Sequence, residues 1–470
     1  MEVKYKKLIK NTAIFTIGSF GSKLLSFFIV PLYTYVLSTS EYGRIDLFTT
    51  AISLMLPFTT LLMQEAVIRF VSSKEIEEAE SISNSFLVFC YGVIVVLAFR
   101  PLYYHGFQFG EYTDIYVCAL ILNTYNSIFS QHLRAVGKTV AFSINGIINT
   151  AVFLSGNLIF LFVLDMGMIG YFYSMLISQF VCAVHVTICG RLFHNFSIKK
   201  FDINILKEML RYSVPLIPNS LMWWIMNAGD KYIINCFLGD SANGIYSVSM
   251  KIPTIISMAY NIFMQAWQLS AIEENDKEGN SDFYNSVFAM LSVMMGLLSA
   301  GIIMGVYPAF SILLNESYLS AWKYVPYLCI ATIISCFATF AGTTYIVAKK
   351  STKAFTTTLL GAVINLLLNF LLIKNLGLYG VAAGTACGYF AVLMVRFRDM
   401  QIDLKISLDY RRFILLLALL LAESICVVAF PVAWKIIIGC VTIFAVCMLY
   451  RKESISVFRI IRKKIISLKF

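Results

Sequence analysis

The chain has 470 residues, of which 59% are hydrophobic and 13% are charged, and its mean hydropathy is +0.78. Water-soluble proteins typically carry about 25% charged residues, so this composition excludes a soluble protein. The apolar residues occur in runs of about 20 rather than in period-2 alternation, which excludes a membrane β-barrel and indicates a bundle of transmembrane helices. The net charge of +11 does not indicate nucleic-acid binding, because the basic residues mark one side of a membrane.

The basic segment MEVKYKKLIKN leads directly into an apolar stretch that has no small-residue cleavage site. A secretory signal peptide needs such a site, so we expect the first apolar segment to remain as a helix. Apolar runs long enough to cross the hydrocarbon core predict about fourteen transmembrane helices. Their approximate ranges are 11–36, 43–70, 82–104, 114–133, 139–164, 168–190, 209–238, 243–271, 283–306, 320–347, 354–374, 378–396, 412–430 and 432–450.

Lysine and arginine are unevenly distributed between the two sides of these spans. With a cytoplasmic N-terminus, 29 of the 37 basic residues lie in inner segments and 5 in outer segments. By the positive-inside rule, this distribution predicts that both termini are cytoplasmic and that the number of spans is even. The remaining three, Lys23, Lys231 and Lys251, fall at membrane depth.

The two halves of the chain resemble each other. A shift of 201 residues aligns LSTSEYG at 37–43 with LGDSANG at 238–244, and other pairs align at the same offset. Small residues recur often in membrane helices, so chance similarity is the alternative explanation. We favour an internal repeat.

This repeat predicts an all-α polytopic membrane protein with two six-helix lobes in parallel repeat. The lobes cover residues 1–200 and 201–400, and residues 401–470 form an extra helix pair with a basic cytoplasmic tail. An even number of spans gives both lobes the same orientation. A substrate site is then expected between them.

No metal or cofactor site is predicted. The eleven cysteines form no C-x-x-C pair, and the four histidines show no metal-ligand spacing. Gly137-Lys138-Thr139 resembles the end of a phosphate-binding loop, but His132 occupies the position where that loop requires a glycine. We therefore expect no ATPase.

Nearly every polar residue of the first span lies on one side of the helix. At about 100° per residue they fall, with Lys23, within an arc of about 80°. They are Thr12, Thr16, Ser19 and Ser26. Serine and threonine often bond to their own backbone, but a lysine at membrane depth costs about 2.5 to 3.5 kcal/mol on insertion scales. We therefore expect Lys23 to face a cavity.

The second span of each predicted lobe carries a polar pair. Asp46 and Gln64 are eighteen residues apart, which is five helical turns and one face. Lys251 and Gln265 are fourteen residues apart, close to four turns, and the two glutamines align in the repeat. These pairs predict two halves that line a common cleft, and a buried hydrogen bond between neighbouring helices is the alternative.

The seventh span places Trp223, Asn227 and Lys231 at i, i+4 and i+8, which predicts a shared face. Asp230 precedes Lys231 directly. Their side chains diverge by about 100°, so each needs a partner elsewhere.

Ionisable residues also occur at the inner ends of spans. Glu65 and Arg69 in QEAVIRF are four residues apart and predict a local ion pair, either structural or gating. Arg134 is a second candidate for an inner gate, although the positive-inside rule also explains it. The acids Asp46, Glu65 and Asp230 are candidates for coupling transport to H⁺ or Na⁺.

The excess of cations at membrane depth predicts an anionic cargo. Among the acids, only Asp46 and Asp230 are expected deep enough to pair with the three lysines, and an ammonium group suits phosphate. The predicted cargo-binding residues are Lys23, Lys231, Lys251, Asn227, Gln64, Gln265 and Trp223.

The segments NTAIFTIGSFGSKLLSFFIVPLYTYVLSTSEYGRIDLFTT and QEAVIRF resemble the N-terminal region of bacterial polysaccharide repeat-unit flippases. These proteins are O-antigen, capsule and exopolysaccharide transporters of the multidrug/oligosaccharidyl-lipid/polysaccharide (MOP) exporter superfamily. The resemblance covers about residues 1–400, and the first helix hairpin is its most specific motif.

The resemblance implies a fold like that of the MATE transporters, with a central cavity, in the bacterial inner (plasma) membrane. It implies that the protein moves undecaprenyl-diphosphate-linked oligosaccharide to the outer leaflet by alternating access. Lys23, Lys231 and Lys251 are then the positions that would meet the diphosphate or acidic sugars. Polysaccharide polymerase and glycosyltransferases of the same pathway are implied partners.

Three alternatives remain. A cation-coupled multidrug exporter of the same fold would carry an essential acid on the first helix, where this chain has Lys23. A membrane-bound glycosyltransferase or ligase would need a large outer loop, but the longest outer segment, 307–319, has one acid, Glu316. We therefore expect no enzyme. A lipid II-type flippase is the third alternative, because the helix pair at 412–450 resembles its added helices, which form a lipid groove.

Overall fold

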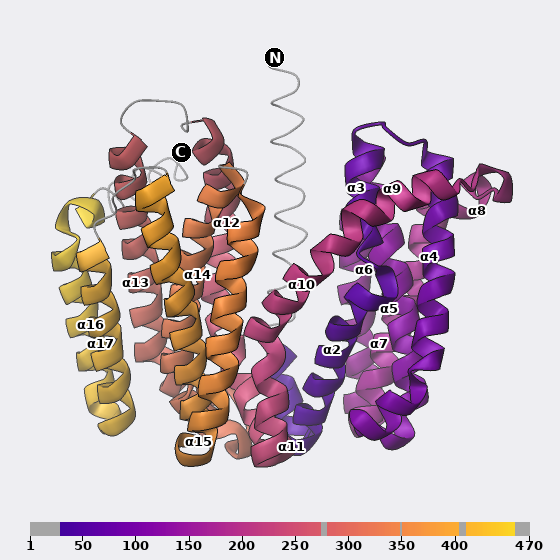
Figure 1. Ribbon diagram of the computed structural model, residues 1–470. Helices are drawn as coiled ribbons and strands as arrows, with labels where there is room; N and C mark the ends of the chain where they lie inside the picture. Colours follow the sequence, from indigo (N-terminus) through magenta and orange to yellow (C-terminus); the bar gives the residue numbers. More distant parts are fainter. Residues whose placement is uncertain (1–28, 274–279, 348–349, 404–409, 456–470) are drawn as a thin grey trace, which may run out of the picture. The chain divides into compact units, whose positions relative to one another are not determined.

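The computed structural model describes residues 29–273, 280–347, 350–403 and 410–455. These residues form helices joined by short turns, with no strand among them (Figure 1). Eight of the described helices are long and apolar enough to cross a membrane, or nine when one bent pair is counted as a single span. The predicted all-α, multi-pass membrane fold is therefore confirmed.

Chain contacts divide the protein into two compact units, Met1–Trp224 and Ile225–Phe470. The helices of the first unit surround α5. They are α2 (Thr39–Thr60), α3 (Met63–Ser72), α4 (Glu78–Ala98), α5 (Thr113–Ala135), α6 (Thr139–Asn157), α7 (Gly167–Gly190), α8 (Leu192–Asn195), α9 (Ile203–Ser213) and α10 (Ile217–Trp224). The helices of the second unit are α11 (Asp230–Lys251), α12 (Pro253–Glu273), α13 (Asn280–Leu313), α14 (Val325–Val347), α15 (Ser351–Asp403), α16 (Tyr410–Ala429) and α17 (Val432–Leu449).

Helix α2 begins with a capping box, in which Ser38 and Glu41 satisfy each other's backbone N–H groups. The predicted continuous span 43–70 is wrong, because α2 and α3 meet at a bend of 55°. Leu61 and Leu62 adopt the left-handed conformation there, with φ of 49° and 52°. Asp46 and Gln64 therefore lie on two differently directed helices rather than on one face.

The predicted single span 209–238 is also divided. Helix α9 ends at Ser213, a 3₁₀ turn follows over Val214–Leu216, and a π turn over Ile225–Gly229 separates α10 from α11. Pro215 and Pro218 cannot donate backbone hydrogen bonds, which is why the helix does not run through. The π turn breaks the predicted i, i+4, i+8 spacing of residues 223 to 231.

Two long helical segments reverse at a glycine. Gly239 in α11 has φ of 82° and Gly377 in α15 has φ of 54°, a conformation that glycine adopts without a Cβ penalty. The Tyr246 hydroxyl contacts Asp230 at 2.6 Å, although sixteen residues of straight helix would separate them by about 24 Å. The predicted turns after residues 238 and 374 are therefore confirmed.

Each unit has an aromatic core. In the first, the Phe48 ring stacks on Phe172 at 4.2 Å and meets Tyr116 edge-on at 5.1 Å. In the second, Phe337 lies 4.4 Å from Phe413 and 5.0 Å from Phe288, measured between ring centres. Such pairs contribute about 0.5–1.5 kcal/mol beyond their area burial, so they fix the neighbouring helices against each other.

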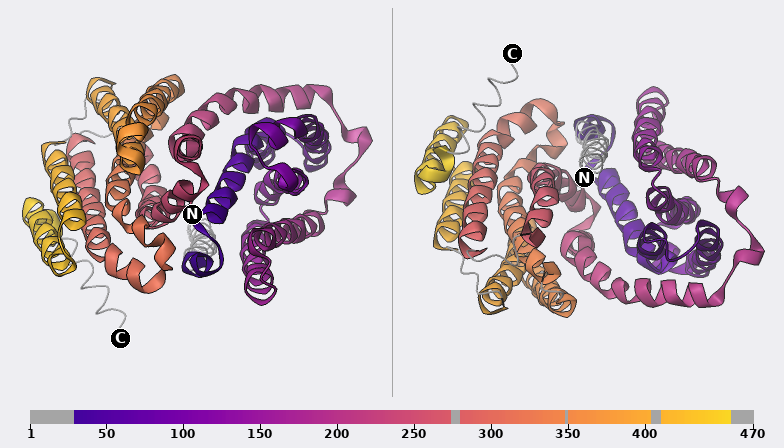
Figure 2. Two further views of the ribbon diagram at one scale, coloured as in Figure 1. Left: turned by 90° about the horizontal axis from the view of Figure 1, so that it is seen from below. Right: turned by 90° about the horizontal axis from the view of Figure 1, so that it is seen from above.

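Helices α16 and α17 form a hairpin that packs against α13; Figure 2 shows the pair in yellow. Gly439 in α17 allows this close approach, since a Cβ there would lie 2.4 Å from the Cβ of Met304. Gly296 in α13 similarly leaves room for Leu416. The extra helix pair is thus an integral part of the second unit.

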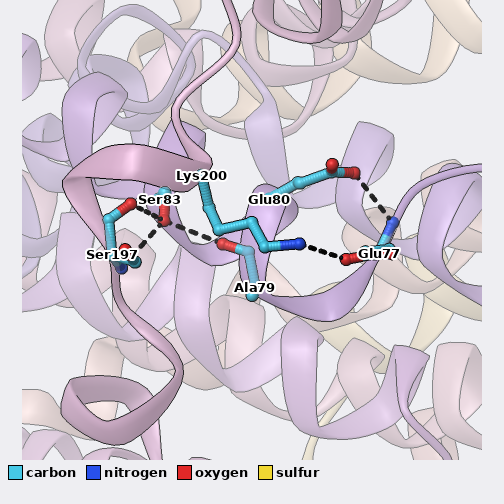
Figure 3. A network of polar contacts seen from close by, with 6 residues as sticks. All are labelled: Glu77, Ala79, Glu80, Ser83, Ser197 and Lys200. Atoms are coloured by element: carbon cyan, nitrogen blue, oxygen red, sulfur yellow. Dashed lines mark hydrogen bonds and ion pairs between the residues drawn. The ribbon is translucent and has the colours of Figure 1, made fainter.

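The segment after α8 is fastened to the start of α4 (Figure 3). The Ser83 hydroxyl donates to the Ser197 carbonyl at 3.0 Å and accepts from the Ser197 N–H at 3.2 Å. Lys200 Nζ donates to Glu77 Oε2 at 2.7 Å. This hydrogen bond lowers the pKa of the Glu77 carboxyl and raises the pKa of Lys200.

Candidate functional site

A buried carboxylate lies in the interior of the second unit. Asp230 is 2% exposed and occupies the first turn of α11, where the helix dipole favours negative charge. Its Oδ2 accepts from the Tyr246 hydroxyl at 2.6 Å and from the Thr385 hydroxyl at 3.5 Å. Asp230 therefore has a partner away from Lys231, as its position next to that lysine predicted.

The contacts of Asp230 continue along α15. Asn365 Nδ2 donates to the Thr385 hydroxyl oxygen at 3.1 Å, and Asn369 Nδ2 donates to Asn365 Oδ1 at 3.4 Å. Gly384 makes room for this row, since a Cβ there would lie 2.2 Å from Asn369 Oδ1. We name Asp230, Tyr246, Thr385, Asn365 and Asn369 the Asp230 network. It is a chain of neutral groups that ends at one ionisable group, an arrangement suited to accepting a proton or cation.

The π turn before α11 is attached to α15 by a second tyrosine. The Tyr389 hydroxyl lies 2.9 Å from Asn227 Oδ1 and 3.1 Å from the Met226 carbonyl, and its single proton serves one acceptor at a time. Asn227 is exposed, whereas Met226 is buried. The tyrosine thereby orients a predicted cargo residue next to the Asp230 network.

A buried arginine lies near the end of α15. Arg396 is 3% exposed, and its guanidinium donates to the Ala338 carbonyl at 2.7 Å, to Thr358 at 3.0 Å and to Thr357 at 3.2 Å. None of these acceptors is a carboxylate. Gly342 leaves space for the guanidinium, which lies 2.5 Å from where its Cβ would be. Arg396 was expected at the inner end of the span 378–396, and its burial was not predicted.

Lys435, which was expected at the outer end of the span 432–450, is 3% exposed. Its Nζ donates to the carbonyl of Val427 and lies 4.1 Å from the centre of the Trp322 ring. The helical partner of that carbonyl would be the N–H of Pro431, which proline lacks. Lys435 therefore caps the C-terminal end of α16, where a cation also suits the helix dipole.

Glu423, one turn before Val427 on α16, is 1% exposed. Neither carboxyl oxygen has a hydrogen-bond partner within the described part of the chain. The prediction that only Asp46 and Asp230 are deep acids is therefore wrong. The hydropathy pattern does not single out Glu423, because it is one acid within the apolar run ILLLALLLAESICVVAF.

The predicted cargo residues belong to both units, so each is described where it lies in its own unit. Lys231 and Lys251 are half-buried near the two sequence ends of α11, and Gln64 is half-buried with Oε1 lacking a partner in the described residues. Trp223 is half-buried in α10. Lys23 and the side chain of Gln265 lie outside the described residues. The cargo-binding role of all these residues stays a prediction.

The remaining predicted residues lie in the first unit. Asp46 is buried in α2, whereas Glu65, Arg69 and Arg134 are exposed. The expected ion pair between Glu65 and Arg69 does not form. The Arg69 guanidinium instead lies 4.6 Å from the centre of the Tyr212 ring in α9, a cation–π contact.

A family model described as "Polysaccharide biosynthesis protein" matches residues 8–268 of this chain. No curated protein matches the chain significantly.

Solved structures of MOP superfamily transporters share the fold. A multidrug resistance MATE family transporter in an inward-facing conformation is 15% identical, with a TM-score of 0.67 over 82% of this chain and 94% of that one. An outward-facing structure of such a transporter is 16% identical, with a TM-score of 0.60 over 84% and 95%.

A third structure, of a MOP superfamily transporter from Pyrococcus furiosus, is described as having a binding pocket of reversed polarity that suggests a different function. It is 14% identical, with a TM-score of 0.57 over 84% of this chain and 95% of that one. These likenesses confirm the predicted MATE-like fold.

Proposed function

Because the chain belongs to the polysaccharide biosynthesis protein family, we propose that it is a flippase for lipid-linked oligosaccharides. It moves undecaprenyl-diphosphate-linked repeat units from the cytoplasmic to the outer leaflet of the bacterial plasma membrane by alternating access. The observation that carries this proposal is the family match over residues 8–268, which is more than half of the chain. The MOP-type transporter fold supports it.

The diphosphate of the cargo is assigned to the lysines at membrane depth. Lys231 and Lys251 are half-buried, and Lys23 precedes the described part of the chain. In a low-dielectric cleft an ammonium group attracts a diphosphate more strongly than in water. Gln64, Gln265, Asn227 and Trp223 are the neutral cargo contacts of the proposal.

Transport is coupled to H⁺ or Na⁺ through the Asp230 network in this proposal. The Asp230 carboxylate accepts a hydrogen bond from the Tyr246 hydroxyl at 2.6 Å. A proton or cation on the carboxylate reduces its negative charge and so weakens this charge-assisted hydrogen bond. Loading therefore changes the contact between the two arms of the α11 hairpin. Asp46 and Glu65 are the other candidates for coupling.

A multidrug exporter is the alternative within this fold, since the similar solved structures include multidrug transporters. Their sequence identity of 15–16% supports a shared fold and not a shared substrate. A lipid II-type flippase is a second alternative, because α16 and α17 form an added hairpin.

The test is display of surface polysaccharide in a bacterial strain that lacks its own flippase. The wild-type chain restores display, and replacing Lys23, Lys231 or Lys251 by Gln lowers display more than it lowers protein abundance in the membrane. Exposed Lys374, replaced by Gln, is the control and leaves display unchanged. Normal display by all three variants would contradict the cargo site, and resistance to drugs without display would favour the exporter.

A further inference from the structure

The first unit contains a pocket that none of the predicted site residues lines. Helices α2, α5, α6 and α7 line an open pocket with a volume of about 230 Å³. Seven of its ten lining residues carry amides or hydroxyls, although more of its exposed lining is apolar than polar. The amide residues are Asn123, Asn126, Asn145, Asn149 and Gln179. No lysine, arginine, histidine, aspartate or glutamate lines it. We name it the amide pocket.

Two carbonyl oxygens of the amide pocket lack a hydrogen bond. Asn126 is 9% exposed, and its Nδ2 donates to both the backbone carbonyl and the Oε1 of Gln179, at 2.8 and 2.7 Å. Its Oδ1 is buried and has no partner in the described residues, and the same holds for Asn149 Oδ1. Burying a carbonyl oxygen without a hydrogen-bond donor costs free energy, so a ligand that donates hydrogen bonds to these two oxygens would be favoured.

Neighbouring residues hold the polar wall in place. Asn145 Oδ1 lies 3.1 Å from His185 Nδ1, and the Asn145 backbone carbonyl accepts from the Cys182 thiol at 3.5 Å. The Asn126 amide is fixed by its two bonds to Gln179. The free acceptor of Asn126 therefore belongs to a wall that is formed before any ligand arrives, which lowers the ordering cost of binding.

The pocket lies at the middle of the spans. Asn126, Asn149 and Gln179 lie near the centres of α5 (Thr113–Ala135), α6 (Thr139–Asn157) and α7 (Gly167–Gly190). Lipid tails cannot satisfy amide groups at that depth. The pocket must therefore open to a water-accessible surface, and half-exposed Asn123, Ser127 and Ser130 mark its mouth.

We propose that the amide pocket binds one uncharged sugar ring of the cargo, a class of cargo that rests on the proposed function. Asn126 Oδ1 and Asn149 Oδ1 accept hydrogen bonds from ring hydroxyls or from an acetamido N–H. The volume is smaller than the roughly 300–1,000 Å³ of sites for drug-sized ligands, and it suits a single ring. The carbohydrate and the diphosphate are thus recognised by different parts of the chain.

The lining disfavours the other ligand classes. A phosphate needs cations or free backbone N–H groups, and the lining consists of uncharged side chains on helix interiors. A metal cation prefers carboxylate oxygens, which the lining lacks. A neutral donor of several hydrogen bonds satisfies the open acceptors without burying a charge.

The test is direct binding of monosaccharides to the purified full-length protein in detergent, measured by saturation-transfer difference NMR. Glucose, galactose, rhamnose and N-acetylglucosamine are the probes, with inorganic phosphate and NaCl tested by thermal shift. We expect at least one neutral sugar to bind the wild type. Asn149→Ala should weaken its affinity by about tenfold, because one hydrogen bond is lost. Asn149→Asp keeps an acceptor oxygen and should bind within about threefold of wild type.

Asn157→Ala is the matched control. Like half-buried Asn149, the buried Asn157 is an α6 asparagine whose Oδ1 lacks a partner in the described residues, but it does not line the amide pocket. It should leave sugar binding unchanged. The proposal is overturned if no neutral sugar binds the wild type, if Asn149→Ala binds like wild type, or if Na⁺ alone stabilises the protein through Asn149.

This binding assay separates the site from the proposed function. If sugar binding depends on Asn149 but the protein moves no lipid-linked oligosaccharide, the proposed sugar site stands and the proposed flippase function is refuted. If the protein transports that lipid but binds no sugar, the proposed flippase function stands and the proposed sugar site is refuted.

Discussion

At the scale of single residues, three buried ionisable residues of the second unit are held by neutral partners. Arg396 donates to a carbonyl and two threonine hydroxyls, Lys435 caps a helix end, and Asp230 accepts from a tyrosine. Burying a charge is costly unless hydrogen bonds compensate for lost water. Each charge therefore depends on a specific geometry, and small changes in that geometry should have large effects.

Arg396→Lys provides a test of this dependence. Lysine keeps the charge but cannot reproduce the three contacts of the guanidinium fork, so we expect a loss of about 1–3 kcal/mol in the free energy of unfolding. Thermal unfolding in detergent measures it. Arg398→Lys is the control, because Arg398 is exposed two residues away. Equal stability of the two variants would contradict the structural role of Arg396.

Asp230→Asn tests coupling by the Asp230 network. Asparagine preserves the shape and an acceptor for the Tyr246 hydroxyl but carries no charge, so the protein should fold and reach the membrane. Transport should lose its dependence on a pH or Na⁺ gradient and fall at least about tenfold, which corresponds to about 1.4 kcal/mol. Transport assays in liposomes with imposed gradients check this. If transport by this variant still depends on the gradient, Asp230 is not the coupling residue, and Asp46 and Glu65 become the candidates.

The sequence identified Asp230 but not its surroundings. Tyr246 is sixteen residues away and becomes a neighbour only because the chain reverses at Gly239. Arg396 and Lys435 stand at predicted span ends, where hydropathy does not distinguish a surface charge from a buried one. Glu423 is a single acid in an apolar run, and its burial depends on the packing of α16 against α13 and α14.

At the scale of elements, turns marked by glycine were predictable and those formed by other residues were not. Gly239 and Gly377 end helices where the sequence predicts it. The bend at Leu61 and Leu62 has no glycine or proline at the break, so its two apolar residues looked like helix interior. Pro215 argues against one continuous helix over 209–238, because proline lacks the backbone N–H that a helix interior requires.

The contact between Glu77 and Lys200 fastens the segment after α8 to α4 (Figure 3), and its pH dependence follows from the pKa shifts. The lowered pKa of Glu77 means that the contact is lost as pH falls through that pKa, below the ordinary value of 4.5. The raised pKa of Lys200 means that it is lost as pH rises through a value above 10.5. Between these limits the contact should be constant.

Glu77→Gln removes the charge at neutral pH. Residues 197–202 should then exchange amide hydrogens faster, since the segment loses one of its side-chain contacts with α4 and keeps those of Ser83. Hydrogen exchange read by mass spectrometry measures this, with Glu75→Gln as the control on a neighbouring exposed acid. Unchanged exchange in Glu77→Gln would show that the ion pair contributes nothing to this anchor.

At the scale of the whole molecule, composition and apolar runs were sufficient for the fold class, and the two lobes expected from the repeat at 201 residues stay a prediction. Contacts divide the chain after Trp224, within the segment that carries two prolines. The orientation rests on the distribution of lysine and arginine. Tags at residues 75 and 200 should report the cytoplasm, and tags at 240 and 376 the exterior. A cytoplasmic tag at 240 would contradict the parallel repeat.

The central claim is that this chain moves a lipid-linked oligosaccharide across the membrane. The most direct measurement uses the purified full-length protein in liposomes that contain fluorescent undecaprenyl-diphosphate-linked oligosaccharide, with quenching of the outer leaflet to follow exchange between leaflets. We expect the wild type to move the lipid at least about tenfold faster than empty liposomes and faster than the Asp230→Asn variant. Exchange no faster than in empty liposomes, under imposed H⁺ and Na⁺ gradients of either direction, would contradict the account.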